Sequence, residues 1–172
     1  LKDGSVKVAD FGIARISSAQ NTLTREALGS VHYISPEQAK GAHVDARSDL
    51  YSLGVVMYEM LTGRPPFDGD TPVSVAIQHI NSIPLSPREI DPTIPEALEE
   101  ITMKAMAPNP DNRYASADEM LADLEEFRKN PNINFEYSLN EFMPEEEPDE
   151  VTEEEIRLMV DVGKEKGAIE QS

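Results

Sequence analysis

Apolar residues recur at helical spacing along most of the chain, so the pattern predicts a mainly α-helical protein. The strongest segment runs from about Ser48 to Leu61, where one stripe consists of Leu50, Leu53, Met57, Met60 and Leu61. The opposite side is also apolar, so we expect this helix to be buried nearly all round. Gly63 and the following Pro65-Pro66 end it, because glycine favours a helix end and proline cannot continue a helix.

Start signals predict three further helices. Thr71 followed by Pro72 is a capping residue with proline in the first turn. Pro95 opens a helix whose apolar face contains Leu98, Ile101, Ala105 and Met106. Ser116 and Glu119 have the spacing of a capping box, and the apolar stripe that follows consists of Met120, Leu121, Leu124 and Phe127.

The beginning of the chain has a different pattern. Val6 and Val8 alternate with polar residues after a turn at Asp3-Gly4, which predicts a short strand. Residues 10–38 are irregular and rich in Ser, Thr and Gly. An irregular stretch of this length in a compact domain is usually functional. Because the sequence starts with Leu and reaches a strand almost at once, we expect that residues preceding Leu1 are missing.

The net charge of −18 is concentrated toward the end of the chain. Residues 1–128 carry 11 basic and 20 acidic side chains, whereas residues 129–172 carry 4 basic and 13 acidic ones. We therefore expect a packed domain over 1–128 and an acidic disordered linker over 129–150. A short amphipathic helix is expected over 151–172, where Thr152 and Glu155 form a second capping box.

Composition excludes several classes of function. The chain has no cysteine, which removes disulfides and thiolate chemistry, and His32, His43 and His79 lack the spacing of a zinc site. We interpret these histidines as surface or packing residues. A surface this acidic repels nucleic-acid phosphates, and no apolar run reaches the roughly 18 residues that a membrane span needs.

Short motifs follow one another in a fixed order. Asp10-Phe11-Gly12 comes directly after the predicted strand, where a carboxylate can hold Mg²⁺ against nucleotide phosphates. By itself this tripeptide is no more than a strand-end turn. It is followed, however, by Gly29-Ser30-Val31-His32-Tyr33-Ile34-Ser35-Pro36-Glu37, Asp49-Leu50-Tyr51-Ser52-Leu53-Gly54, Gly63-Arg64-Pro65-Pro66-Phe67 and Arg113-Tyr114.

This ordered set resembles the second half of the protein kinase domain, and the resemblance covers residues 1–128. It implies a helical kinase C-terminal lobe with a remnant of β-strand at its start. Within the kinases, the Gly29–Tyr33 and Asp45–Asp49 segments are similar to bacterial membrane-anchored serine/threonine kinases with extracellular PASTA repeats. That similarity implies a single-pass parent protein with its kinase domain on the cytoplasmic side, protein substrates, and a kinase dimer as a further partner. Membrane attachment would come only from other regions of the parent.

The resemblance also implies roles for single residues. Asp10 would bind the Mg²⁺ that bridges the ATP phosphates, with Phe11 packing in the core and Gly12 allowing the turn. Thr22 and Thr24 match activation-loop threonines that are autophosphorylated, and Ser30 matches a substrate-positioning hydroxyl, usually Thr.

The structural positions are Glu37 and Arg113, which match a buried ion pair, and Asp49, which matches a buried aspartate that holds the catalytic loop. The alternatives to these roles are that Thr22 and Thr24 are ordinary loop threonines and that Glu37 is an acid in a first helical turn.

Phosphoryl transfer needs parts that the sequence does not contain. There is no G-x-G-x-x-G loop and no H-R-D-type loop, so the catalytic aspartate is expected upstream of Leu1. We therefore expect a fragment of an ATP- and Mg²⁺-dependent serine/threonine kinase that is inactive by itself. The alternatives are a non-catalytic docking module and a fusion, because Val151–Gly163 also resembles the segment before the CBS domains of CorC/hemolysin-C-type transport proteins.

Overall fold

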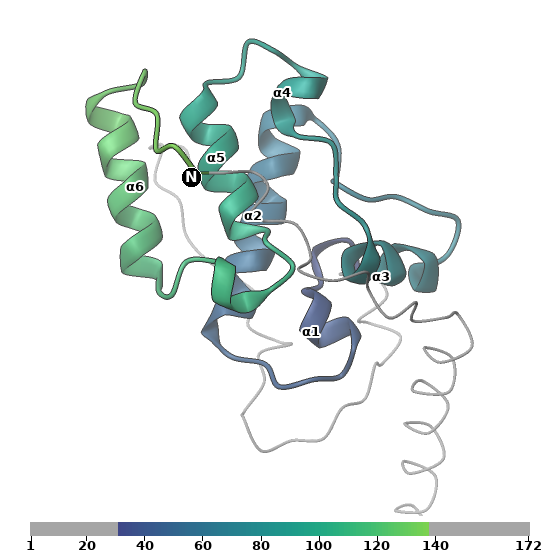
Figure 1. Ribbon diagram of the computed structural model, residues 1–172. Coiled ribbons are helices and arrows are strands. Elements are labelled where there is room, and N and C mark those ends of the chain that lie inside the picture. Colours follow the sequence, from purple (N-terminus) through teal and green to yellow (C-terminus); the bar gives the residue numbers. More distant parts are fainter. Residues whose placement is uncertain (1–30, 138–172) are drawn as a thin grey trace, which may run out of the picture.

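The computed structural model describes residues 31–137, and these residues form a helical body (Figure 1). Within that range the regular elements are helices, as the mainly α class predicted. In chain order they are η2 (Val31–Tyr33), α1 (Pro36–Ala39), α2 (Ala46–Thr62), α3 (Pro72–Asn81), α4 (Pro87–Ile90), α5 (Glu96–Ala105), η3 (Pro110–Asn112) and α6 (Ala117–Lys129).

Helix α2 is the longest element, and the others are arranged around it. It starts two residues before the predicted Ser48, because the Asp45 carboxylate accepts a hydrogen bond from the Arg47 N–H and caps the helix. It ends at Gly63, whose φ of 76° lies in the left-handed region. Helix α5 packs along α2 and α6 packs on α5, while α3 lies against α1 and η2 (Figure 1).

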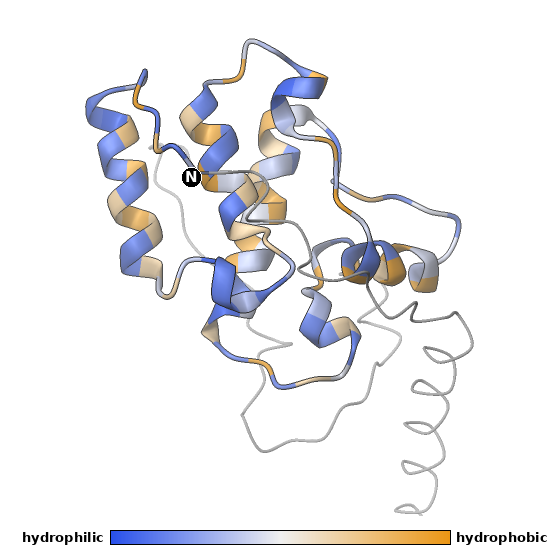
Figure 2. Ribbon diagram, in the orientation of Figure 1, coloured by the Kyte–Doolittle hydropathy of each residue, from blue (hydrophilic) through white to orange (hydrophobic). Residues whose placement is uncertain are grey.

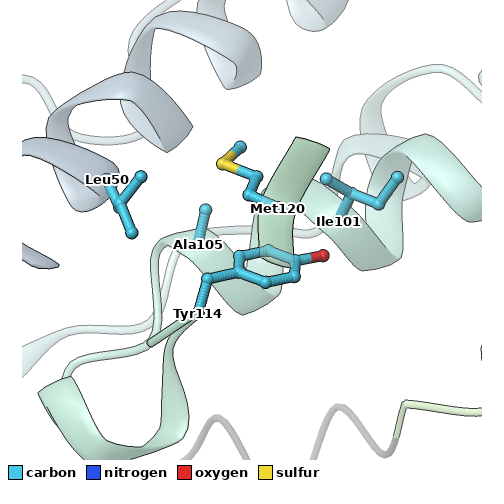
Figure 3. Packing of buried hydrophobic residues seen from close by; sticks show 5 residues of the cluster. All are labelled: Leu50, Ile101, Ala105, Tyr114 and Met120. Carbon is cyan, nitrogen blue, oxygen red and sulfur yellow. The ribbon is translucent and has the colours of Figure 1, made fainter. Parts of the chain in front are cut away.

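Two buried clusters hold these helices together. The first joins α2, α5 and α6 and consists of Leu50, Ile101, Ala105, Tyr114 and Met120, which Figure 3 shows converging between the helices. The second joins α2 to the end of α5 and consists of Tyr51, Val55, Tyr58 and Met106. Hydrophilic and hydrophobic residues alternate along α6, as the blue and orange of Figure 2 show.

The expectation that α2 is buried nearly all round is wrong for one face. Leu53, Val56 and Met60 are 45%, 40% and 80% exposed. They lie three and four residues apart, so they share one stripe of the helix. The described elements pack against the opposite face, which carries Tyr51 and Val55, and nothing in residues 31–137 covers the stripe.

The predicted helix starts are present, with one difference in detail. The Thr71 hydroxyl accepts from the Ser74 N–H at the start of α3, and the Ser116 hydroxyl accepts from the Glu119 N–H at the start of α6. The Glu119 carboxylate, however, accepts from the Ala115 N–H and not from Ser116, so the capping box is only half formed. The one-turn helix α1 begins after Ser35 and has Glu37 in its first turn, which was one of the alternatives for that residue, whereas the one-turn helix α4 after Ser86 was not predicted.

The packed body extends past the expected boundary at Arg128. Phe135 packs on the first cluster and donates its backbone N–H to the Glu100 carboxylate at 3.0 Å. Tyr137 stacks on Phe135 and donates its hydroxyl to Asp123 at 2.8 Å. These two aromatic rings bury apolar surface, so the linker expected from residue 129 does not begin before residue 138.

Several expectations fall outside the described residues, namely the strand at Val6 and Val8, the acidic linker beyond Tyr137 and the helix over 151–172. Between residues 31 and 137, no helix combines the length and the apolar character that crossing a membrane requires.

Gly54 tests how tightly α2 and α5 pack. A Cβ atom at this position would lie 2.8 Å from Met106 Cγ and 2.9 Å from Ala105 Cβ. Alanine favours a helix over glycine by about 1 kcal/mol, but overpacking costs about 1–3 kcal/mol. We therefore expect Gly54→Ala to lower the free energy of unfolding by roughly 1 kcal/mol in urea denaturation. Val56→Ala on the exposed face of the same helix is the control, with a change within about 0.5 kcal/mol. A Gly54→Ala variant more stable than the wild type would contradict this packing.

Candidate functional site

The structure describes only part of the predicted site. Asp10, Phe11, Gly12, Thr22, Thr24 and Ser30 lie outside the described residues. Glu37, Asp49 and Arg113 lie inside them, together with the segment that follows Ser30. This segment, Val31–Ser35, is called the substrate loop below, because the resemblance places the substrate-positioning Ser30 directly before it.

The substrate loop leads into α1 through a well-formed helix cap. The buried Ser35 accepts the Gln38 N–H at its hydroxyl, and the Gln38 side chain accepts the Ser35 N–H at 3.0 Å. Pro36 follows in the first turn, where its missing N–H costs nothing. The cap fixes the direction of α1, and Glu37 in its first turn is thereby buried.

Glu37 meets Arg113, 76 positions later in the chain, in a two-point ion pair. Arg113 Nη1 lies 2.7 Å from Glu37 Oε1, and Nη2 lies 2.8 Å from Oε2. The Ser48 hydroxyl at the start of α2 donates a further hydrogen bond to the same carboxylate. The structure thus brings together the two residues that the resemblance paired.

Backbone carbonyls take the remaining donors of Arg113. Its Nε donates to Ala107 O at 2.6 Å, Nη2 to Pro108 O at 3.0 Å and Nη1 to Arg47 O at 3.2 Å. The guanidinium therefore joins α1, the start of α2 and the turn after α5. A buried guanidinium with its donors satisfied is tolerated where an unpaired one would not be.

Opposing effects act on the pKa of Glu37. Burial alone would raise it, but the hydrogen bonds from Arg113 and Ser48 and the positive charge of Arg113 together hold the pKa below its ordinary value. The carboxylate is accordingly ionised at neutral pH and keeps Arg113 paired.

A second set of contacts runs from Arg113 to the substrate loop. The Arg113 guanidinium lies over the Tyr51 ring, 4.8 Å from its centroid. The Tyr51 hydroxyl lies 2.8 Å from His79 Nδ1, and His79 Nε2 lies 3.1 Å from the backbone oxygen of His32. Burial lowers the pKa of His79 to about 4, so its ring is neutral. The sequence had suggested only a surface or packing role for His79, because its partners Tyr51 and His32 are distant in the chain.

Helix α2 holds the next residue of the substrate loop. The Ser52 hydroxyl donates to Tyr33 O at 2.7 Å, and the Tyr33 hydroxyl donates to the Glu59 carboxylate at 2.7 Å. The Glu59 carboxylate raises the pKa of Tyr33, first through this hydrogen bond, with burial contributing as well. Both ends of the Tyr33 residue are therefore fixed to one helix.

Asp49 differs from expectation. The resemblance matched it to a buried aspartate, but its side chain is exposed. Its expected partner is the backbone of a catalytic loop, and the 172 residues contain no such motif. Asp49 also lies four residues before Leu53, so it is part of the uncovered stripe of α2.

The described part of the site is a loop backbone that buried side chains hold in place. Within residues 31–137, no group of three His, Cys, Asp or Glu side chains gathers in a way that could hold a metal ion. The magnesium ligand predicted at Asp10 lies outside this range. The buried contacts instead hold the backbone of Val31–Ser35 in one position.

The stability contributed by Glu37 should depend on pH. At pH 7 we expect Glu37→Gln to lower the free energy of unfolding by roughly 3 kcal/mol, because Arg113 stays charged and buried. A carboxylate with a depressed folded pKa stabilises above its unfolded pKa, and this contribution is lost as the pH falls through the folded value. The difference between wild type and variant should therefore shrink below about pH 4.3, the ordinary glutamate pKa.

Urea denaturation of the chain at pH 7, 5 and 3.5 measures this difference. Glu125→Gln is the control, because Glu125 pairs with Arg128 on the surface of α6 and should contribute less than about 1 kcal/mol. Equal changes in the free energy of unfolding at pH 7 would show that the buried Glu37 pair contributes no more stability than a surface pair.

Comparison with known proteins agrees with this geometry. The model of the protein kinase domain family matches residues 1–124. A probable serine/threonine-protein kinase of Clostridium perfringens is 50% identical over 133 residues, which cover 77% of this chain and 19% of that protein. The serine/threonine-protein kinase PknB of Mycobacterium tuberculosis is 54% identical over 123 residues, which cover 70% of this chain and 20% of PknB.

The solved structures agree at the level of fold. The twitchin kinase region from C. elegans matches with a TM-score of 0.51 at 19% identity, covering 80% of this chain and 22% of that one. The chain thus spans about a fifth of the length of the curated relatives that it matches. The helical body in residues 31–137 corresponds to the kinase C-terminal lobe, and the chain belongs to the protein kinase domain family.

Proposed function

We propose that this chain is the substrate-binding part of an ATP-dependent protein serine/threonine kinase. The observation that carries the proposal is the anchored substrate loop, whose backbone is held by α2 and α3 and connected to the buried Glu37–Arg113 pair. Phosphoryl transfer depends mainly on positioning and electrostatics, so a rigid acceptor platform is a functional requirement of the reaction.

The remaining roles follow from the match to the kinase motifs. Asp10 would hold Mg²⁺, which when bound neutralises the ATP phosphates, and Ser30 would orient the acceptor hydroxyl. Thr22 and Thr24 would be autophosphorylated, with the added charge ordering their loop against Arg15 and Arg25. Asp49 would be covered by a catalytic loop in the parent protein. These residues are outside the described range except Asp49, whose exposed carboxylate is free to accept such a loop.

The parent protein would phosphorylate other proteins on the cytoplasmic side of a membrane that it crosses once. The similarity to the bacterial serine/threonine-protein kinase PknB supports the kinase part of this proposal. A kinase dimer is a further proposed partner.

Residues 138–150 would be an acidic linker, and residues 151–172 would be a short helix that belongs either to the kinase or to a fused CBS-type transport segment. Flanking sequence decides between these, because PASTA repeats and CBS domains have different motifs.

The 172-residue chain should not transfer phosphate by itself, because the sequence contains neither a glycine-rich loop nor a catalytic aspartate motif. The longer parent protein should transfer the γ-phosphate of ATP to a basic acceptor protein, and mass spectrometry should then find phosphate on Thr22 and Thr24. The measurement compares both proteins with ATP and Mg²⁺.

Asp10→Ala is the matched control in both proteins, since contaminating kinases would be unaffected by it. The parent carrying Asp10→Ala should lose transfer by a factor of at least about 100, as expected for a lost ligand of the catalytic metal. A parent without transfer would support the alternative of a docking module. Transfer by the short chain that disappears with Asp10→Ala would contradict the expectation that the fragment is inactive.

A further inference from the structure

We propose that His79 is a positioning residue that sets the substrate loop, because it holds the backbone oxygen of His32 from helix α3. This inference rests on the proposed kinase function and adds to it a residue outside the kinase motifs. His79 lies in the last turn of α3, whereas the motif residues come from α1, α2 and the turn around Arg113.

The position of His79 is fixed on all sides. Its side chain is 1% exposed, and its ring packs edge-on against Tyr51 at 5.7 Å and Phe67 at 4.9 Å between centroids. Its two nitrogens each have one polar neighbour, the Tyr51 hydroxyl at 2.8 Å and the His32 backbone oxygen at 3.1 Å. A ring held in this way cannot rotate without losing both hydrogen bonds.

The two neighbours select one tautomer. A backbone oxygen can only accept a hydrogen bond, so Nε2 must carry the proton. Nδ1 then has a free lone pair, which accepts a hydrogen bond from the Tyr51 hydroxyl. Burial keeps the ring neutral at physiological pH, which leaves this arrangement as the populated one. His79 therefore acts as a donor of fixed direction toward the substrate loop.

This bond controls a part of the loop that α2 does not hold. Helix α2 fixes Tyr33 through Ser52 and Glu59, and the Ser35 cap fixes the start of α1. His79 holds the oxygen of His32, one residue before Tyr33 and two after Ser30. The orientation of the peptide between His32 and Tyr33 accordingly depends on α3, and the acceptor polypeptide would lie against this segment.

A purely structural reading is that His79 merely fills the space between Tyr51 and Phe67. The two readings differ in what a ring of similar shape without nitrogen atoms would do. Such a ring would preserve the packing and lose the donor to His32. The Tyr51 hydroxyl would then lack a partner, so it has to be removed as well to keep the comparison free of an unsatisfied buried group.

The experiment compares Tyr51→Phe/His79→Phe with Tyr51→Phe alone, so that the two proteins differ in the imidazole of residue 79 and its hydrogen bond to His32. A third variant, His79→Gln, restores an N–H donor near the position of Nε2. Amide hydrogen–deuterium exchange of residues 31–35 is measured in the 172-residue chain. The Michaelis constants for an acceptor peptide and for ATP, and kcat, are measured in the parent kinase.

We expect faster exchange in residues 31–35 of the double variant than of Tyr51→Phe, with unchanged exchange in α5 and α6. In the parent kinase, the peptide KM should rise roughly tenfold, the effect of losing about one buried hydrogen bond, while the KM for ATP and kcat change less than about twofold. His79→Gln should recover most of the peptide KM, which a mere packing role would not predict.

Unchanged exchange in residues 31–35 would overturn the inference, whether or not the parent is active. An active parent whose peptide KM is unaffected by the double variant would also overturn it. If the wild-type parent transfers no phosphate, the proposed function fails, and the exchange measurement alone then decides whether His79 sets the loop.

Discussion

The buried pair of Glu37 and Arg113 is the constraint on which the rest of the structure depends. Moving two charges out of water costs several kcal/mol per ion, and only a complete set of hydrogen bonds offsets that cost. The pair has such a set, from Ser48 on one side and from three backbone oxygens on the other. Helix α1, the start of α2 and the turn after α5 must therefore adopt one relative position, since any displacement would leave a charge unpaired.

A series of contacts connects this pair to the backbone of the substrate loop. Arg113 lies over Tyr51, Tyr51 meets His79, and His79 holds the oxygen of His32. Helix α2 holds the adjacent Tyr33 directly. The fold thus connects a structural ion pair to a loop backbone through a short series of buried side chains, which is the property that the proposed substrate platform needs. The uncovered stripe of α2, by contrast, has no packing partner within residues 31–137.

The sequence predicted the local features of this fold well and its long-range features poorly. Periodicity and caps located α2, α3, α5 and α6, because such signals lie within a few neighbouring residues. Periodicity could not reveal that Met60 is exposed or that Tyr137 is packed, because both depend on which segments come to lie nearby. The pairing of Glu37 with Arg113 was expected only from the family resemblance, and the role of His79 had no local signal at all.

A double-mutant cycle between Glu37 and Arg113 tests the central claim most directly. Glu37→Gln, Arg113→Met and the double variant are compared by urea denaturation, and the exposed pair of Glu125 and Arg128 serves as the reference cycle. The account predicts a coupling free energy of about 3 kcal/mol for the buried pair and below about 1 kcal/mol for the exposed one. Coupling of the buried pair as small as that of the exposed pair would contradict the claim that it fixes the arrangement of the site.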